Sequence, residues 1–350
     1  MSTHNPVPTA KARGRGSRTW IPAILSVGIS AALVIWILST LGDPAALLDS
    51  FGSASVPLLL AIVPVSLASH AVRATRWRRF LGTRDHAGAS FASLMLGYSL
   101  NVVVPRGGEV ARVVAMNRAS RIAVPRLAAT VLAERILDVI ALVALIGVSF
   151  LIDGDRIEAT MPELARVAPG ALAGASIGVA FVVAVAVAGG QVARILETVF
   201  GRIHAGLGRR VGALAREAVE GFAILRRPVD ASIALVETLA IWGLYLLTFV
   251  LGLAAFSLLE TTGLEGATVV FAVTSASVLI PSQGAIGVFH KFGETALTEL
   301  YGVLPETALA CVTALHAILF LFVGGVLGAA VFGTRWLLAR GQAVPRGDAS

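Results

Sequence analysis

The chain has 350 residues, of which 56% are hydrophobic and only 14% are charged, and its mean hydropathy is +0.84. Soluble domains carry about 25% charged residues, so this composition excludes a soluble enzyme or binding module and indicates a protein of the lipid bilayer. The net charge of +7 does not indicate a nucleic-acid partner, because most cations lie between apolar stretches, where they set the membrane topology.

Six apolar stretches are long enough to cross a bilayer, which takes about 20 residues per helix. They span residues 20–41, 56–72, 127–152, 168–188, 231–259 and 306–332. The first is interpreted as a retained helix, because it is long for a signal peptide and no clear small-residue cleavage site follows it. Two further apolar stretches, 88–105 and 266–281, end at a proline.

The cations are concentrated in every second connection. The two chain ends and the segments 73–84, 106–126 and 194–227 hold 24 of the 28 Lys and Arg residues. By the positive-inside rule, both termini are cytoplasmic and the chain is a multi-pass protein of the cell's inner (plasma) membrane. The flanks of 88–126 are then both cytoplasmic and those of 266–304 both external. Each of these regions is therefore predicted to enter and leave the membrane on one side.

The expected fold is an all-α polytopic membrane protein with about six spanning helices and two oppositely oriented re-entrant hairpins, arranged as inverted repeats. The transmembrane domain covers 20–333, with halves 20–152 and 168–333 and an amphipathic cytoplasmic loop at 190–230. Basic tails at 1–19 and 334–350 are expected in the cytoplasm. Paired interruptions in two halves indicate a transporter's midplane site. The alternative is a chance coincidence of two Pro/Gly breaks in a glycine-rich chain.

The first break carries charges beside two glycines. A helix that begins after Gly107 and Gly108 places Arg106, Glu109 and Arg112 along one side of its first turns. A helix N-terminus suits an anionic group such as phosphate, and arginine forks match phosphate oxygens. Glu109 would stabilise the helix start or hold one arginine. The alternative is a cytoplasmic loop with solvated charges.

Three charges lie within the apolar stretch 127–152. Glu134 and Asp138 are four residues apart and share one helical face, while Arg135 lies about 100° around the helix. An ion near the bilayer centre costs about 2.5–3.5 kcal/mol, so these groups are expected to face the protein interior or a wet cavity. We expect Arg135 or Arg112 to pair with a carboxylate and the surplus charge to contact a substrate headgroup or a coupling proton. The alternatives are a purely structural ion pair and snorkelling to the interface.

The second break, at residues 281–291, contains polar but uncharged residues until His290 and Lys291 at its end. His290 and Glu294 are spaced as i, i+4 partners, and His290 with Lys291 would bring positive charge to an outward mouth. The alternative is that both cations cap a helix end or reach the interface. The candidate residues of this break are Pro281, Ser282, Gln283, Gly284, Gly287, His290 and Lys291.

Other polar residues receive structural interpretations. The segment 73–80 either binds anionic lipid headgroups or stops transfer, with Trp77 as an interface anchor. Glu237 and His316, each alone in an apolar run, are expected to make a satisfied interior hydrogen bond. The six histidines have no metal-ligand spacing, and no nucleotide-binding or nucleophile-elbow motif is present, so no metal, cofactor, ATP-driven step or hydrolase chemistry is expected.

Three motifs, at residues 101–113, 129–142 and 280–292, together resemble the lysylphosphatidylglycerol synthase transmembrane region family, also called the flippase-like domain. The resemblance spans about residues 22–332 and implies movement of a lipid or polyprenyl-linked headgroup between leaflets. Many members carry Glu where this chain has His290, which puts that carboxylate's role in doubt. Members that aminoacylate phosphatidylglycerol carry a further soluble domain, so no transferase activity is expected here. The family pattern matches Pro105, Arg106, Gly107, Gly108, Glu109, Arg112, Glu134, Arg135, Asp138, Pro281, Gly284 and Gly287.

The predicted function is a flippase-like or scramblase-like transporter of the cell envelope, without enzymatic activity. Its expected substrate is an anionic phospholipid or a polyprenyl-phosphate-linked lipid, and its expected protein partner is a second copy or an envelope-synthesis enzyme. Passive and proton-driven movement fit equally. Two rival functions are a membrane enzyme with Glu134 and Asp138 as acid and base, and a non-transporting partner of an envelope-synthesis complex.

Overall fold

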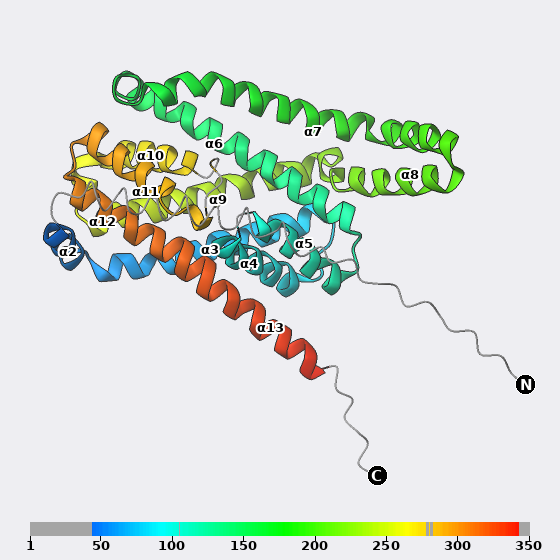
Figure 1. The fold of residues 1–350 in the computed structure, drawn as a ribbon, viewed down its shortest axis with the longest axis horizontal. Helices are drawn as coiled ribbons and strands as arrows, with labels where there is room; N and C mark the ends of the chain where they lie inside the picture. The colour runs from blue at the N-terminus through cyan, green and yellow to red at the C-terminus, as the bar shows by residue number, and fades with distance from the viewer. Residues whose placement is uncertain (1–43, 105, 278–279, 281–282, 343–350) are drawn as a thin grey trace, which may run out of the picture.

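The computed structural model describes residues 44–342, apart from residues 105, 278–279 and 281–282. Every regular element within these described residues is helical (Figure 1). The predicted first spanning stretch, the N-terminal tail and the last eight residues lie outside the described part.

Among the described residues, four helical runs are long and apolar enough to cross a membrane. A fifth is α7 (Pro162–Ile203), if its two arms, which are bent by 68°, count as one span. These five correspond to the five predicted stretches that the structure describes, so the chain is a multi-pass membrane protein. The four runs are α3 (Val56–Phe80), α6 (Val124–Thr160), α9 (Pro228–Ala255), and the run formed by α12 (Pro305–His316), η5 (Ala317–Leu327) and the start of α13 (Gly328–Gln342).

Prolines mark where these long helices begin. Pro57, Pro125, Pro228 and Pro305 lie in the first turns of α3, α6, α9 and α12. Proline suits this position because its missing N–H group would have no partner inside the helix and its φ angle is already helical. A short helix, α2 (Pro44–Ser53), precedes α3.

The first broken stretch forms a helical hairpin. Helix α4 (Ala87–Val103) is about 26 Å long, shorter than a hydrocarbon core of about 30 Å, and α5 (Gly107–Ser120) packs back against it. Two glycines permit this packing: a Cβ atom added to Gly97 would lie 3.0 Å from the carbonyl oxygen of Gly108. The turn places Arg106 at φ +60°.

The second broken stretch also doubles back. Helix α10 (Leu259–Ala276) packs against α11 (Val288–Thr295) and against the π-helix η4 (Ala296–Leu300). The connection contains the short η3 (Gln283–Ala285) and three positive φ angles, +56° at Gly284, +60° at Ala285 and +83° at Gly287. A Cβ on Gly284 would lie 3.4 Å from the carbonyl oxygen of Val102, so the tips of the two hairpins touch.

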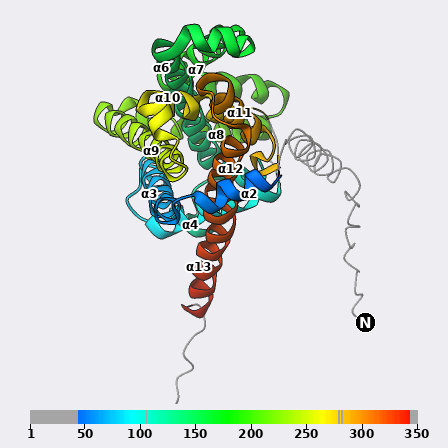
Figure 2. The ribbon, with the colours of Figure 1, turned by 90° about the vertical axis from the view of Figure 1, so that its left-hand side faces the viewer.

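The predicted amphipathic loop is a pair of antiparallel helices. The second arm of α7 packs against α8 (Ala205–Glu220), which is followed by the short η1 (Ala223–Arg226). Gly208 lies against Gly201, and Arg216 pairs with Glu197, so the two helices form one arm. This arm extends beyond α3 and α5 at one end of the molecule (Figure 1), while α13 extends away from the helix bundle in another direction (Figure 2).

The close contact of α4 and α5 generates a testable prediction. In Gly108→Ala, the new Cβ would lie within 2.7 Å of Asn101 Oδ1 and closer still to the Gly97 carbonyl oxygen, so we expect a loss of about 1–3 kcal/mol. The matched control is Gly147→Ala in α6, whose Cβ would meet nothing within 4 Å. Thermal unfolding of the purified protein in detergent measures the difference. Equal melting temperatures of the two variants would contradict the packing.

Candidate functional site

Seven charged side chains from three helices meet in the interior of the molecule. We call this set the charge cluster. Helix α3 supplies the first two of its members, α5 the next two and α6 the last three. The members are Arg73, Arg76, Glu109, Arg112, Glu134, Arg135 and Asp138.

Asp138 is the most heavily shared carboxylate of the cluster. One of its oxygens, Oδ2, lies 2.6 Å from Arg73 Nη1 and 3.3 Å from Arg135 Nη2, and the other, Oδ1, lies 2.9 Å from Arg76 Nη2. Arg76 also donates a hydrogen bond of 2.7 Å to Thr238 Oγ1 on α9. Asp138 therefore holds three guanidinium groups and, through Arg76, connects α3 and α6 to α9.

The deepest part of the cluster is the Arg76–Glu134–Arg112 group. Arg112 Nη2 lies 2.9 Å from one Glu134 oxygen, and Arg76 Nε lies 3.8 Å from the other. All three side chains are at most 2% exposed. Arg112 also lies over the ring of Trp77, with Cζ 4.9 Å from the centroid. Its Nη1 meets no hydrogen-bond acceptor among the described residues, which leaves one buried donor unused.

The open edge of the cluster is the Glu109–Arg135 pair. Glu109 bridges two arginines, at 3.0 Å to Arg112 Nε and at 3.7 Å to Arg135 Nη1. The Arg135 side chain is 41% exposed and that of Glu109 31%, whereas the deeper arginines are almost fully buried. Because four arginines face three carboxylates, the cluster has one positive charge in excess.

Uncharged polar rings continue from the cluster along α3, α4 and α9. The four residues, which we call the aromatic wall, are His70, Tyr98, Trp242 and Tyr245. His70 stacks on Tyr98 at 4.3 Å between centroids, the Tyr98 and Tyr245 hydroxyls are 3.5 Å apart, and the Tyr245 ring lies 5.7 Å from Arg73 Cζ. The Trp242 ring follows at 6.3 Å from Tyr245. His70 Nδ1 and Trp242 Nε1 are buried and have no hydrogen-bond partner among the described residues.

A helix was predicted to start after Gly107 and Gly108; α5 instead begins with Gly107 itself, and the N–H groups of its first two residues already have partners. The N–H of Gly107 donates to the Val104 carbonyl oxygen at 2.9 Å, and that of Gly108 donates to Asn101 Oδ1 at 2.8 Å. Arg106 is exposed, at the N-cap position, and makes no ion pair that the structure describes. Two donors at the α5 N-terminus are therefore satisfied within the protein, and the cluster one turn further along carries the charges.

Arg135 or Arg112 was expected to pair with a carboxylate, and the structure shows that both do; Glu134 and Asp138 share one face of α6 as expected. Two cluster members, Arg73 and Arg76, were missed. The segment 73–80 was interpreted as a membrane-surface element with Trp77 as an interface anchor, yet Trp77 is fully buried and donates to Thr130 Oγ1.

A periodic signal for Arg73 and Arg76 exists in the sequence. They continue the helical spacing of the buried α3 residues Ile62, Ser66 and Ser69, which places them on the inward face.

The second break differs from the expectation at His290. Its side chain is buried and lies 4.7 Å, between ring centroids, from His316, and it makes no contact with Glu294 that the structure describes. Lys291 pairs with Glu294 instead, at 3.1 Å. His290 is thus part of an interior histidine pair rather than of a charged mouth. Pro281 and Ser282 lie outside the described residues, and Gln283 begins η3.

The two isolated polar residues behave as expected. His316 Nε2 donates a hydrogen bond of 2.7 Å to the Gly284 carbonyl oxygen, which ties the last spanning run to the tip of the second hairpin. Glu237 accepts two hydrogen bonds from Arg79, at 3.1 and 3.2 Å. No group of three or more potential metal ligands occurs in the part of the chain that the structure describes.

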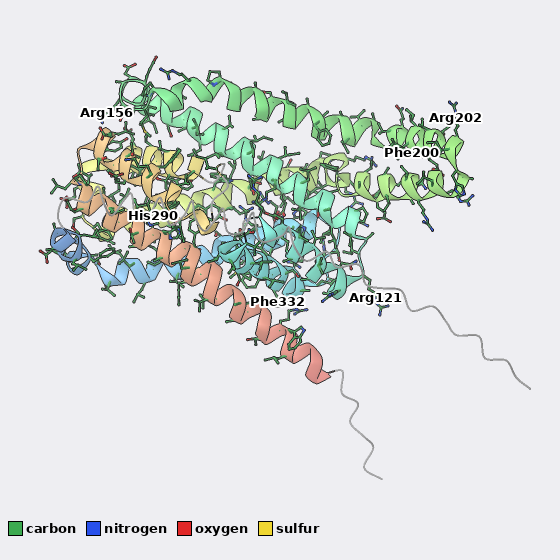
Figure 3. The ribbon with its side chains drawn as sticks, in the orientation of Figure 1. Arg121, Arg156, Phe200, Arg202, His290 and Phe332 are labelled. Atoms are coloured by element: carbon green, nitrogen blue, oxygen red, sulfur yellow. The ribbon has the colours of Figure 1, made fainter. Side chains whose placement is uncertain are left out.

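Arginine side chains lie at both ends of the molecule. Figure 3 shows Arg121 and Arg202 at one end and Arg156 at the other. Near Arg156, the Tyr301 hydroxyl donates to Asp153 at 3.3 Å. Burial, together with the neighbouring Asp153 carboxylate, raises the pKa of Tyr301 to about 12, so this hydroxyl keeps its proton.

The unequal burial of the carboxylates generates a prediction for stability. Asp138→Asn leaves Arg73 and Arg76 buried beside a neutral amide, and we expect a loss of about 3–5 kcal/mol. Glu109→Gln, at the open edge, is the matched control, with an expected loss of about 1 kcal/mol or less. Thermal unfolding in detergent at neutral pH measures both. A larger effect for Glu109→Gln would contradict the arrangement.

Comparison with known proteins places the chain in a family. The model described as the lysylphosphatidylglycerol synthase TM region matches residues 23–328, which include both hairpins and the whole charge cluster. No curated protein and no solved structure matches the chain. Because the match covers most of the 350 residues, the chain belongs to the lysylphosphatidylglycerol synthase transmembrane region family.

Proposed function

We propose that this protein moves the phosphate-bearing headgroup of a lipid or polyprenyl-linked lipid between the two leaflets of the inner membrane. The observation that carries the proposal is the charge cluster, with four arginines, three carboxylates and one partly exposed edge. The acyl or prenyl chains stay in the bilayer while the headgroup passes the cluster.

The physical requirement is to replace the water around a phosphate. An ion in hydrocarbon loses its hydration, and the loss is offset only where opposite charges and hydrogen-bond donors are already in place. Arginine forks match phosphate oxygens with two parallel hydrogen bonds. The excess positive charge of the cluster and the unused Arg112 Nη1 supply this environment next to the Glu109–Arg135 edge.

The open edge supports an exchange of ion pairs as the entry step. Glu109 is the most exposed carboxylate of the cluster, and its 3.7 Å pair with Arg135 is longer than its 3.0 Å pair with Arg112. A phosphate that approaches Arg135 takes the place of the Glu109 carboxylate there. The deeper Arg76–Glu134–Arg112 group stays intact and keeps the three helices together.

The proposed membrane arrangement has six spans and two re-entrant hairpins related as inverted repeats, with both termini in the cytoplasm. Three findings support it: the short α4 doubles back through α5, α10 doubles back through α11, and the hairpin tips touch at Val102 and Gly284. Non-helical backbone at membrane depth is tolerated where protein or a wet cavity surrounds it.

A transport function without a catalytic step agrees better with the site than an enzyme does. Glu134 and Asp138 would be the acid and base of a lipid-modifying reaction, yet each is held by two or three guanidinium groups. Both carboxylates are therefore already engaged in ion pairs inside the protein, and neither is positioned as a free acid or base. A second copy of the chain, or an envelope-synthesis enzyme, remains the predicted protein partner.

Translocation in proteoliposomes tests the proposal. Acyl-labelled fluorescent phospholipids are reconstituted with the protein, and a membrane-impermeant quencher reports how fast inner-leaflet lipid reaches the outer leaflet. Arg135→Gln removes the accessible cation of the open edge, and we expect a rate about tenfold lower, the value of one charge-assisted hydrogen bond.

The matched control is Arg216→Gln on α8, a similarly exposed and paired arginine away from the cluster. Its rate should equal that of the unmodified protein. If no phospholipid moves faster than in protein-free vesicles, the transport proposal is wrong and the enzyme or scaffold functions take its place.

A further inference from the structure

We infer that the contact between the two hairpin tips is a gate on the route from the charge cluster to the opposite leaflet, and that the hydrogen bond between His316 and Gly284 is its latch. This inference rests on the proposed function and specifies how the movement is controlled. The residues that meet there are Val102, Gly284 and Gly325, which we call the tip contact.

The tip contact lies close to the charge cluster along α4. A Cβ atom added to Gly97 would lie 3.5 Å from Arg112 Cβ, so this turn of α4 borders the cluster. Val102 is five residues further along the helix, a rise of about 7.5 Å. Under the proposed topology the two hairpins enter from opposite sides of the membrane, so a headgroup that leaves the cluster toward the second leaflet has to pass between their tips.

The cluster edge and the tip contact differ in exposure. The side chains of Glu109 and Arg135 are 31% and 41% exposed, whereas Gly284 is buried and both Val102 and Gly325 are half-buried. A Cβ on Gly284 would lie 3.4 Å from the Val102 carbonyl oxygen, and one on Gly325 would lie 3.6 Å from Val102 Cγ2. A phosphate group does not fit between atoms at these separations. The structure therefore represents a state that is open at the cluster edge and closed at the tips.

The tip contact separates more easily than the cluster does. Buried ion pairs join α3, α5 and α6, and breaking them leaves uncompensated charges. Helix α4 contains no charged residue, so it makes no ion pair with the second hairpin. Backbone atoms and an aliphatic side chain meet at the tip contact instead. Packed elements open first where few strong contacts hold them, which favours movement of the tips over movement of the cluster.

One polar contact holds the second hairpin in the closed position. His316 Nε2 donates a hydrogen bond of 2.7 Å to the Gly284 carbonyl oxygen, and the His316 side chain is buried. If Gly284 moves away from Val102, this buried donor loses its acceptor, which disfavours the open state. A single hydrogen bond of this kind shifts an equilibrium about three- to tenfold, so the latch favours closure and still permits opening.

The segment that follows the latch is suited to a small movement. The π-helix η5 begins directly after His316, and π-helical segments are rare and frequent at functional sites. Glycines of this run face α4: a Cβ on Gly328 would lie 2.6 Å from the Met95 carbonyl oxygen, and one on Gly324 would lie 3.7 Å from Tyr98 Cβ. Because no side chains of these glycines interlock with α4, the run has a smooth surface for sliding of packed helices.

Reversible disulfide trapping tests the gate in the proteoliposome assay. Val102→Cys together with Gly284→Cys places two thiols across the tip contact, where a Cβ on Gly284 would lie 3.7 Å from Val102 Cα. We expect oxidation to slow phospholipid movement by about tenfold or more, because the cross-link holds the gate closed. Reduction with dithiothreitol should restore the rate, which shows that the loss is not misfolding. If the reduced variant does not fold, Val102→Cys with Gly325→Cys makes the same test.

The other outcomes of the trapping experiment are distinct. Full speed after complete cross-linking would overturn the gate and leave the transport proposal intact. Failure of the thiols to cross-link would contradict the tip contact itself. Absence of movement with the unmodified protein would count against the transport proposal instead.

A second cross-link, between α7 and α8, is the matched control. Gly189→Cys with Val219→Cys joins these helices away from both hairpins, where a Cβ on Gly189 would lie 2.8 Å from Val219 Cγ2. Oxidation of this pair should leave the rate unchanged. Equal slowing by both cross-links would contradict a specific role of the tips.

A latch variant tests the same gate in the opposite direction. His316→Phe keeps the ring that stacks on Phe320 and removes the hydrogen bond to Gly284. We expect phospholipid to move about three- to tenfold faster, because the closed state loses its latch. Thr274→Val, which removes a buried hydrogen bond within α10, should leave the rate unchanged. An unchanged or lower rate for folded His316→Phe would show that His316 does not restrain the gate.

Discussion

The structure depends on the neutralisation of buried charge where water is scarce. Asp138 and Glu134 on α6 can enter the interior because Arg73 and Arg76 on α3 and Arg112 on α5 meet them there. Removing any one partner leaves an uncompensated ion, which is far more costly than the absence of the whole pair. The cluster thus connects three helices, and one positive charge remains in excess after this pairing.

Close backbone packing against α4 holds α5 where its Arg112 side chain can reach Glu134. Arg112 reaches Glu134 because Gly97 and Gly108 let α4 and α5 approach to backbone contact, and because Asn101 caps the first turn of α5. Gly97 and Gly108 therefore allow the close approach that positions α5. In the second break, Gly284 has two roles: its carbonyl oxygen accepts from His316, and its lack of a side chain allows contact with Val102.

Sequence reasoning found the parts of the site that stand out against their surroundings. Glu134, Arg135 and Asp138 interrupt an apolar run, so their pairing and the burial of Glu134 were predictable, as were four spanning stretches and a fifth that contains the bent α7. Arg73 and Arg76 were not identified as members of the cluster. Arginines at the end of a spanning helix also act as a topology signal, and composition does not distinguish that role from a buried one. His290 was placed at a mouth for a similar reason: nothing local indicates that His316, 26 residues later, lies beside it at 4.7 Å between ring centroids. In both cases the position of the side chain depends on a contact with a segment that is distant in the sequence.

The distance along the chain between α3 and α6 has a consequence for biosynthesis. Arg73 and Arg76 precede their partner Asp138 by 65 and 62 residues. At a synthesis rate of about 5–20 residues per second, this gap lasts about 3–13 s. During that interval the arginines in the last turns of α3 have no carboxylate partner from α6. Long arginine side chains without such a partner extend toward the aqueous interface. Under the proposed topology, the same two arginines first retain their end of α3 on the cytoplasmic side and are drawn into the protein only when α6 emerges from the ribosome.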